Sequence, residues 1–173
     1  MFRKVNLFRT FKSAVIAAIL FIVPVYFFIR DGLYRESWLL YLGSFLFLVV
    51  IWIHTLRENK LRGENESTVT MVFISHVATI AGIILASLFS FILLSIMVPG
   101  YLESGPPDRS LVGEPANVIK DKTDGLSFEV FFAATVINFA VGSFSGIILS
   151  FYSKRNQIND PNEPSPMHNY GRK

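Results

Sequence analysis

The residues of this chain that could do chemistry are polar side chains inside long uncharged stretches. His76 is the one histidine well inside such a stretch, and Asn138 carries an amide that both donates and accepts hydrogen bonds. Thr79 and Ser145 add hydroxyl groups nearby in the sequence. Such groups are candidates for binding a ligand or ion, or for relaying a proton. The alternative is structural, because neutral histidines and hydroxyls also hold apolar helices together through hydrogen bonds.

The sequence lacks the residue sets that most catalytic and metal sites require. It has no cysteine, which excludes disulfides, thiolate ligands and cysteine nucleophiles. One histidine is not a zinc site, because zinc usually takes three or four protein ligands. Five acids flank the uncharged stretches and could gather at one end of the molecule: Asp31, Glu36, Glu103, Asp108 and Glu129. No histidine–aspartate pair accompanies them. We therefore expect no enzyme activity, with no catalytic residue, no metal and no cofactor.

Four stretches without aspartate, glutamate, lysine or arginine must position the polar residues. They are Ser13 to Ile29, Ser37 to Leu56, Ser67 to Leu102 and Val130 to Ser153. A bilayer's hydrocarbon core is ~30 Å thick, so roughly 20 apolar residues in a helix cross it. Only 17% of the residues are charged, against about 25% in soluble domains. The sequence predicts an all-α integral membrane protein, folded as a four-helix transmembrane bundle.

We assign residues 1–155 to a single transmembrane domain with spans at about 13–29, 37–56, 69–98 and 130–153. The loop 99–128 is the one sizeable segment between spans. The tail 156–173 is polar and rich in Asn and Pro, which predicts disorder. The basic start of the first span also fits a signal peptide, but its bulky end, Val23 to Ile29, favours an uncleaved anchor.

Basic residues predict the orientation, because those close to the ends of spans stay in the cytoplasm. The N-terminal arm, the loop between spans two and three, and the tail together hold eleven of the 16 basic residues. The other two loops hold five. We expect both termini to be cytoplasmic and the loop 99–128 to lie outside.

The third and fourth spans each carry a stripe of small and polar residues. At 100° per residue, one stripe includes Ser75, His76 and Thr79, and the other includes Asn138, Gly142, Ser145 and Gly146. Small residues let helices approach closely. The stripes therefore predict either a tight contact between the two spans or a polar groove that admits a ligand. Counted from the span ends across a ~30 Å core, His76 and Asn138 lie at similar heights and could be neighbours.

Other residues predict the borders of the spans. Trp38 and Trp52 fit anchors at the two headgroup levels, and the first two spans look like a lipid-facing hairpin. His54 lies at the inner boundary, where water can reach it, and needs no special role. Ser67 is a candidate cap for span three, and Ser127 for span four.

The segment Phe73 to Gly82 opens a long third span after a charged loop, and spaced glycines and Lys154-Arg155 close the last span. With the four-span layout, this resembles a family of small bacterial membrane proteins of unknown function common in Bacteroidetes. This chain has His76-Val77 where that family is expected to carry a Tyr-Gly-type pair. The resemblance implies a bacterial inner membrane and carries over no site residue.

Two functional classes fit these observations best. The first is a non-catalytic accessory or interaction component of the inner membrane, with the bilayer and other membrane proteins, or a second copy, as partners. The second is a subunit of a small oligomeric transporter or channel, whose polar path would include His76 and Asn138. The net charge of +3 comes from residues that flank spans, so nucleic acid is not expected as a partner.

Overall fold

Four long helices form the molecule in a computed structural model that describes residues 6–31, 36–61, 67–98, 101 and 125–158. They are α1 (Leu7–Asp31), α2 (Trp38–Lys60), α3 (Thr68–Met97) and a fourth helix in three parts. Those parts are α4 (Leu126–Phe132), the π-helical turn η5 (Ala133–Ile137) and α5 (Asn138–Ile158). All four are long and apolar enough to cross a membrane. The predicted all-α, four-span bundle is confirmed.

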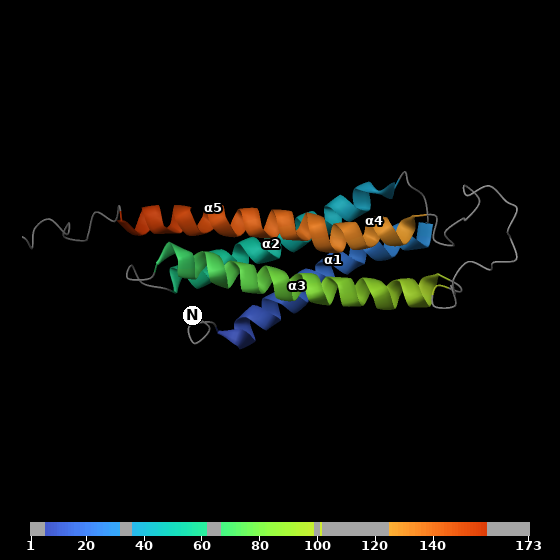
Figure 1. The fold of residues 1–173 in the computed structure, drawn as a ribbon, viewed down its shortest axis with the longest axis horizontal. Helices are drawn as coiled ribbons and strands as arrows, with labels where there is room; N and C mark the ends of the chain where they lie inside the picture. The colour runs from blue at the N-terminus through green and yellow to red at the C-terminus, as the bar shows by residue number, and fades with distance from the viewer. Residues whose placement is uncertain (1–5, 32–35, 62–66, 99–100, 102–124, 159–173) are drawn as a thin grey trace, which may run out of the picture.

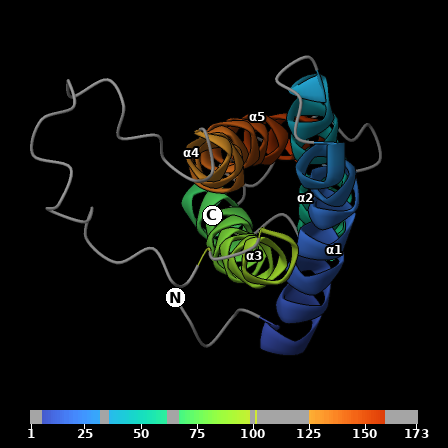
Figure 2. The ribbon, with the colours of Figure 1, turned by 90° about the vertical axis from the view of Figure 1, so that its right-hand side faces the viewer.

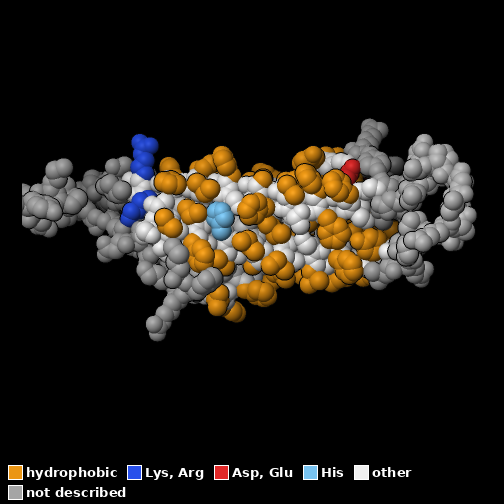
Figure 3. Space-filling view, in the orientation of Figure 1, with side chains coloured by type: hydrophobic (Ala, Val, Ile, Leu, Met, Phe, Trp, Pro, Cys, Tyr) orange, Lys and Arg blue, Asp and Glu red, His pale blue; other side chains and the backbone are white. Residues whose placement is uncertain are grey.

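The helices surround one core in the order α1, α2, α5, α3, so that each packs on two neighbours (Figure 2). Figure 1 shows α3 and α5 side by side along the long axis, while α1 and α2 cross them obliquely. Helix α1 begins, and α5 ends, at the same end of the bundle. We call this the basic end, because Arg9, Arg57 and Arg155 lie there on α1, α2 and α5. Figure 3 shows the apolar belt between the charged ends.

The helices extend beyond the uncharged stretches. Helix α1 includes Arg9 and Lys12, and α2 continues to Lys60. The fourth helix begins at Leu126, inside the predicted loop, and ends at Ile158, so the first three residues of the predicted tail are helical. Backbone hydrogen bonding does not stop where the hydrocarbon ends, and lysine, arginine and glutamate are good helix formers. Residues 102–124 and 159–173 lie outside the described residues.

One of the two predicted caps is confirmed. The side chain of Ser67 accepts a hydrogen bond from the backbone N–H of Thr70, 3.2 Å away, and begins α3. The prediction for Ser127 is wrong. The cap of α4 is Gly125, whose φ of 82° favours glycine, so Ser127 already lies in the first turn of the helix. Glu129 in that turn accepts a hydrogen bond from Ser37 Oγ (3.2 Å), which ties α4 to the start of α2.

The first two spans are not only a lipid-facing hairpin, because they supply the bulkiest part of the core. Phe21 and Phe28 of α1 and Phe47 of α2 are at most 1% exposed. Trp38 and Trp52 remain on the surface, as anchors at the headgroup level would. Aromatic side chains therefore fill the α1–α2 side of the bundle, while small residues line the α3–α5 side.

Helix α2 is hydrogen-bonded to each of the other long helices near the basic end. His54 Nδ1 and Ser13 Oγ of α1 lie 3.0 Å apart, and Thr55 Oγ1 lies 2.9 Å from Ser75 Oγ of α3. Asn59 Nδ2 donates to Ser153 Oγ of α5 (3.2 Å). We expected water to reach His54, but His54 is only 5% exposed, and Asn59 one turn farther along α2 is 2% exposed. The other helices pack over these positions, and the sequence of α2 alone does not show that packing.

Candidate functional site

The predicted contact between the small-residue stripes of α3 and α5 is present and tight. A methyl group added to Gly142 would lie 2.5 Å from Thr79 Cγ2, and one added to Gly146 would overlap Ser75 Oγ. Real carbon atoms do not approach that closely, so only glycine allows the two helices this separation. Thr79 is fully buried and Ser75 nearly so. Around these four residues the contact fills the space that a ligand groove would need.

All four predicted polar candidates satisfy a donor within their own helix. Thr79 Oγ1 donates to the Ser75 carbonyl (3.0 Å), and Ser145 Oγ donates to the Gly142 carbonyl (3.0 Å). His76 is half-buried, and its Nδ1 donates to the Val72 carbonyl, 2.9 Å away. These bonds satisfy the donors that would otherwise be costly in an apolar setting. They favour the structural interpretation of the stripes.

Asn138 differs from the other three candidates. It is fully buried, and its Nδ2 donates to the Ala134 carbonyl (3.2 Å), but its Oδ1 has no partner among the described residues. It directly follows η5, a π-helical turn in which one extra residue is accommodated. Among the four candidates, Asn138 is therefore the one with a buried polar atom that has no partner in the described part of the chain.

His76 and Asn138 are not brought together. A methyl group at Gly146 would lie 3.9 Å from His76 Nδ1, so His76 is level with Gly146. Asn138 lies two helical turns away along α5, or about 12 Å. The earlier estimate assumed a ~30 Å span for both helices. Helix α3 has 30 residues and measures about 45 Å, so a position close to its inner end lies farther from its outer end than assumed.

The acids considered for an enzyme at the membrane surface do not cluster in the part of the chain that the structure describes. Glu36 accepts from Trp38 Nε1 (2.9 Å), and Glu129 from Ser37. Glu103, Asp108 and the side chain of Asp31 lie outside the described residues. Within the described ranges, no three histidine, aspartate or glutamate side chains lie close enough to share a metal ion.

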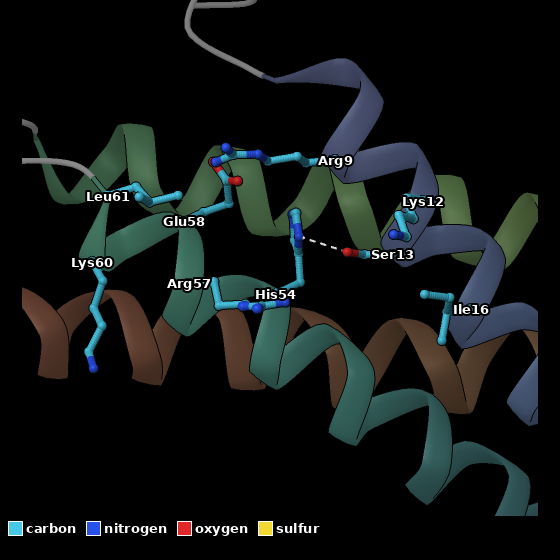
Figure 4. Close-up of a pocket in the computed structure, with 9 residues that line it drawn as sticks. All are labelled: Arg9, Lys12, Ser13, Ile16, His54, Arg57, Glu58, Lys60 and Leu61. Carbon is cyan, nitrogen blue, oxygen red and sulfur yellow. Dashed lines mark hydrogen bonds between the residues drawn. The ribbon is translucent and has the colours of Figure 1, made fainter.

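A pocket that the sequence did not predict lies between α1 and α2 at the basic end (Figure 4). Its volume is about 550 Å³. Its lining is Arg9, Lys12, Ser13 and Ile16 of α1, and His54, Arg57, Glu58, Lys60 and Leu61 at the end of α2. Four of these residues are cationic at neutral pH and one is acidic. We call this the basic-end pocket.

The polar side chains of the basic-end pocket come from both helices. Ser13 and His54 meet across it, and Figure 4 shows the Arg9 side chain pointing toward Glu58. Glu58 is 5% exposed, whereas Arg9, Lys12 and Arg57 are exposed. His54 Nε2 is buried and has no hydrogen-bond partner among the described residues. The pocket thus combines exposed cations with buried polar side chains.

The sequence held a partial signal for this pocket. Basic residues end both spans at the same side of the membrane, and Ser13 and His54 are polar residues within one turn of those ends. What was missing is the packing of α1 on α2, which decides that these residues face each other rather than the lipid.

Comparisons with protein-family models, curated proteins and solved structures found no match to this chain. The resemblance to the Bacteroidetes membrane family therefore stays an expectation.

Proposed function

We propose that this chain is a multi-pass protein of the bacterial inner membrane that acts as a non-catalytic accessory or interaction component. The observation that carries this proposal is the use of the intramembrane polar groups. Thr79, Ser145 and His76 bond to backbone carbonyls of their own helices, and Gly142 and Gly146 seat Thr79 and Ser75. Groups whose donors are satisfied within their own helix can lie in the bundle without a ligand, which leaves the outer surface as the place where the protein can act.

The surface of α3 is the best candidate for contact with a partner. Only 22% of its most apolar stretch is buried, against 44% for α1 and for α2 and 39% for the fourth span. An apolar surface groove of about 360 Å³ runs between α3 on one side and η5 with the start of α5 on the other. It is lined by Ile80, Ile83, Ile84, Thr135, Val136 and Phe139. We propose that a transmembrane helix of another protein, or of a second copy, packs there, because helices associate in lipid by filling such surfaces.

Photocrosslinking in native membranes tests this proposal. A photoreactive phenylalanine analogue replaces Ile84, which is 62% exposed in the groove, or Ile53 of α2, a control that is 51% exposed. We expect a discrete protein adduct from position 84 and none from position 53. An adduct of about twice the 19.5 kDa chain identifies a second copy, and another mass identifies a different partner. Lipid adducts alone at both positions would contradict the proposal.

The alternative, a subunit of an oligomeric transporter or channel, rests on Asn138 and its unpartnered Oδ1. A transport path needs a row of such groups, and the other candidates are bonded within their helices. Flux measurements in proteoliposomes separate the two functions. If the unmodified protein conducts a flux that falls in Asn138→Ala and His76→Ala, the transporter function replaces the accessory function. If the reconstituted protein shows no flux, the result supports the accessory function.

A further inference from the structure

The basic-end pocket has the chemistry of an oxyanion site. Its lining holds four lysine or arginine residues and one acid, Glu58, so the net charge of the lining is positive. Arg9 points toward Glu58, and Lys60 points away from Lys12 and His54 (Figure 4). Lys12 and Arg57 remain for a ligand, and both are exposed. These two side chains carry only donors, which suit a phosphate group.

His54 adds a donor at the buried side of the pocket. Its Nδ1 is hydrogen-bonded to Ser13 Oγ, and its Nε2 has no partner among the described residues. If the serine hydroxyl donates to Nδ1, the ring proton sits on Nε2. An oxyanion beside Nε2 favours the ring states that carry a proton on Nε2, because only a protonated nitrogen can donate a hydrogen bond to it.

The location and shape of the pocket favour a lipid over a free anion. Lys12, Arg57 and Lys60 lie where the uncharged part of each span ends, which is the level of the headgroups. Ile16 continues the lining one turn farther into the span. The pocket thus extends from the phosphate level to the level of the acyl chains. A volume of about 550 Å³ is also far larger than a small inorganic anion fills, and lies in the range of ligand sites, ~300–1,000 Å³.

We propose that the basic-end pocket binds the headgroup of an anionic phospholipid, with the phosphodiester held by Lys12 and Arg57 and approached by His54 Nε2. Basic pockets between helices on the cytoplasmic side are suited to this chemistry. The predicted orientation, with the basic end in the cytoplasm, places the pocket in that leaflet. The site joins α1 to α2 through a lipid, and it does not depend on whether α3 packs against a partner.

Native mass spectrometry of the purified full chain tests the site. The protein is titrated with dioleoyl phosphatidylglycerol or with dioleoyl phosphatidylcholine, which has the same acyl chains and no net charge. We expect the first lipid bound to be phosphatidylglycerol by preference. Lys12→Gln and Arg57→Gln should each weaken its binding about fivefold, from the usual contribution of one basic residue near an anionic surface. Both positions are exposed, so neither variant should disturb the fold.

Arg155→Gln is the matched control, since it removes the same charge from the same end of the bundle, outside the pocket. It should leave phosphatidylglycerol binding within about twofold of the unmodified protein. Equal retention of the two lipids, or equal losses in Arg57→Gln and Arg155→Gln, would overturn the proposal. A large excess of inorganic phosphate should not displace the lipid. Displacement would mean a site for free phosphate and would likewise overturn it.

Discussion

The contact between Thr79 and Gly142 predicts a sharp response to one added methyl group. In Gly142→Ala the new carbon would lie 2.5 Å from Thr79 Cγ2 and 2.8 Å from Thr79 Oγ1. Thr79 cannot rotate away freely, because its side chain is β-branched and its hydroxyl bonds to the Ser75 carbonyl. Overpacking of this kind costs about 1–3 kcal/mol. Alanine's better helix propensity returns up to about 1 kcal/mol. With a cost in the middle of that range, about 2 kcal/mol, and the full return of about 1 kcal/mol, we expect a net loss of about 1 kcal/mol.

The assay is equilibrium unfolding in mixed micelles, followed by the fluorescence of Trp38 and Trp52. A second substitution, Thr79→Ser, removes Cγ2 and keeps the hydroxyl. In the double variant it should recover part of the lost stability, because the 2.8 Å approach to the hydroxyl oxygen remains, giving a coupling free energy of about 0.5 kcal/mol. Ala140→Val adds more volume at an exposed position of the same helix and should change the stability by less than about 0.5 kcal/mol. A Gly142→Ala protein as stable as the unmodified chain would refute the described contact.

Two further predictions concern the buried residues of α2. Phe47→Ala should lower the free energy of unfolding by about 3 kcal/mol or more, because the ring is fully buried, while Phe45→Ala on the exposed face should leave it nearly unchanged. The same micelle titration measures both, and equal effects would contradict the assigned faces of α2. Asn59→Leu should cost about 0.6–2 kcal/mol, since it removes the donor to Ser153 Oγ and leaves α2 and α5 without that hydrogen bond. A hydrogen-exchange comparison should then show faster exchange in the last turns of α5, and unchanged exchange there would count against this link.

The four spans were predictable because the absence of charge over bilayer-length segments is a local property of the sequence. The α3–α5 contact was predictable for a related reason: Gly142, Gly146, Ser75 and Thr79 form stripes with helical periodicity, and such stripes have few other uses. The relative heights of His76 and Asn138 across the membrane were not predictable, because they depend on how far α3 extends past the hydrocarbon core. Helix length alone does not set that offset.

The burial of the residues at the end of α2 was also not predictable, and the reason is a different one. His54, Glu58 and Asn59 follow an apolar span and look like the start of a solvated loop. Their burial depends on three other helices that arrive from distant parts of the chain. The π-helical turn before Asn138 contacts α2 and α3, and nothing in the sequence of Ala133–Ile137 marks it.

The central claim is a four-span bundle with the basic end in the cytoplasm, and the cysteine-free sequence allows a direct test. Single cysteines at Glu36 and Lys60, at opposite ends of α2, are labelled with a membrane-impermeant maleimide in intact bacterial cells without an outer membrane barrier. We expect Glu36→Cys to react from outside and Lys60→Cys to react only after the membrane is permeabilised. Labelling of both positions in intact cells would contradict it.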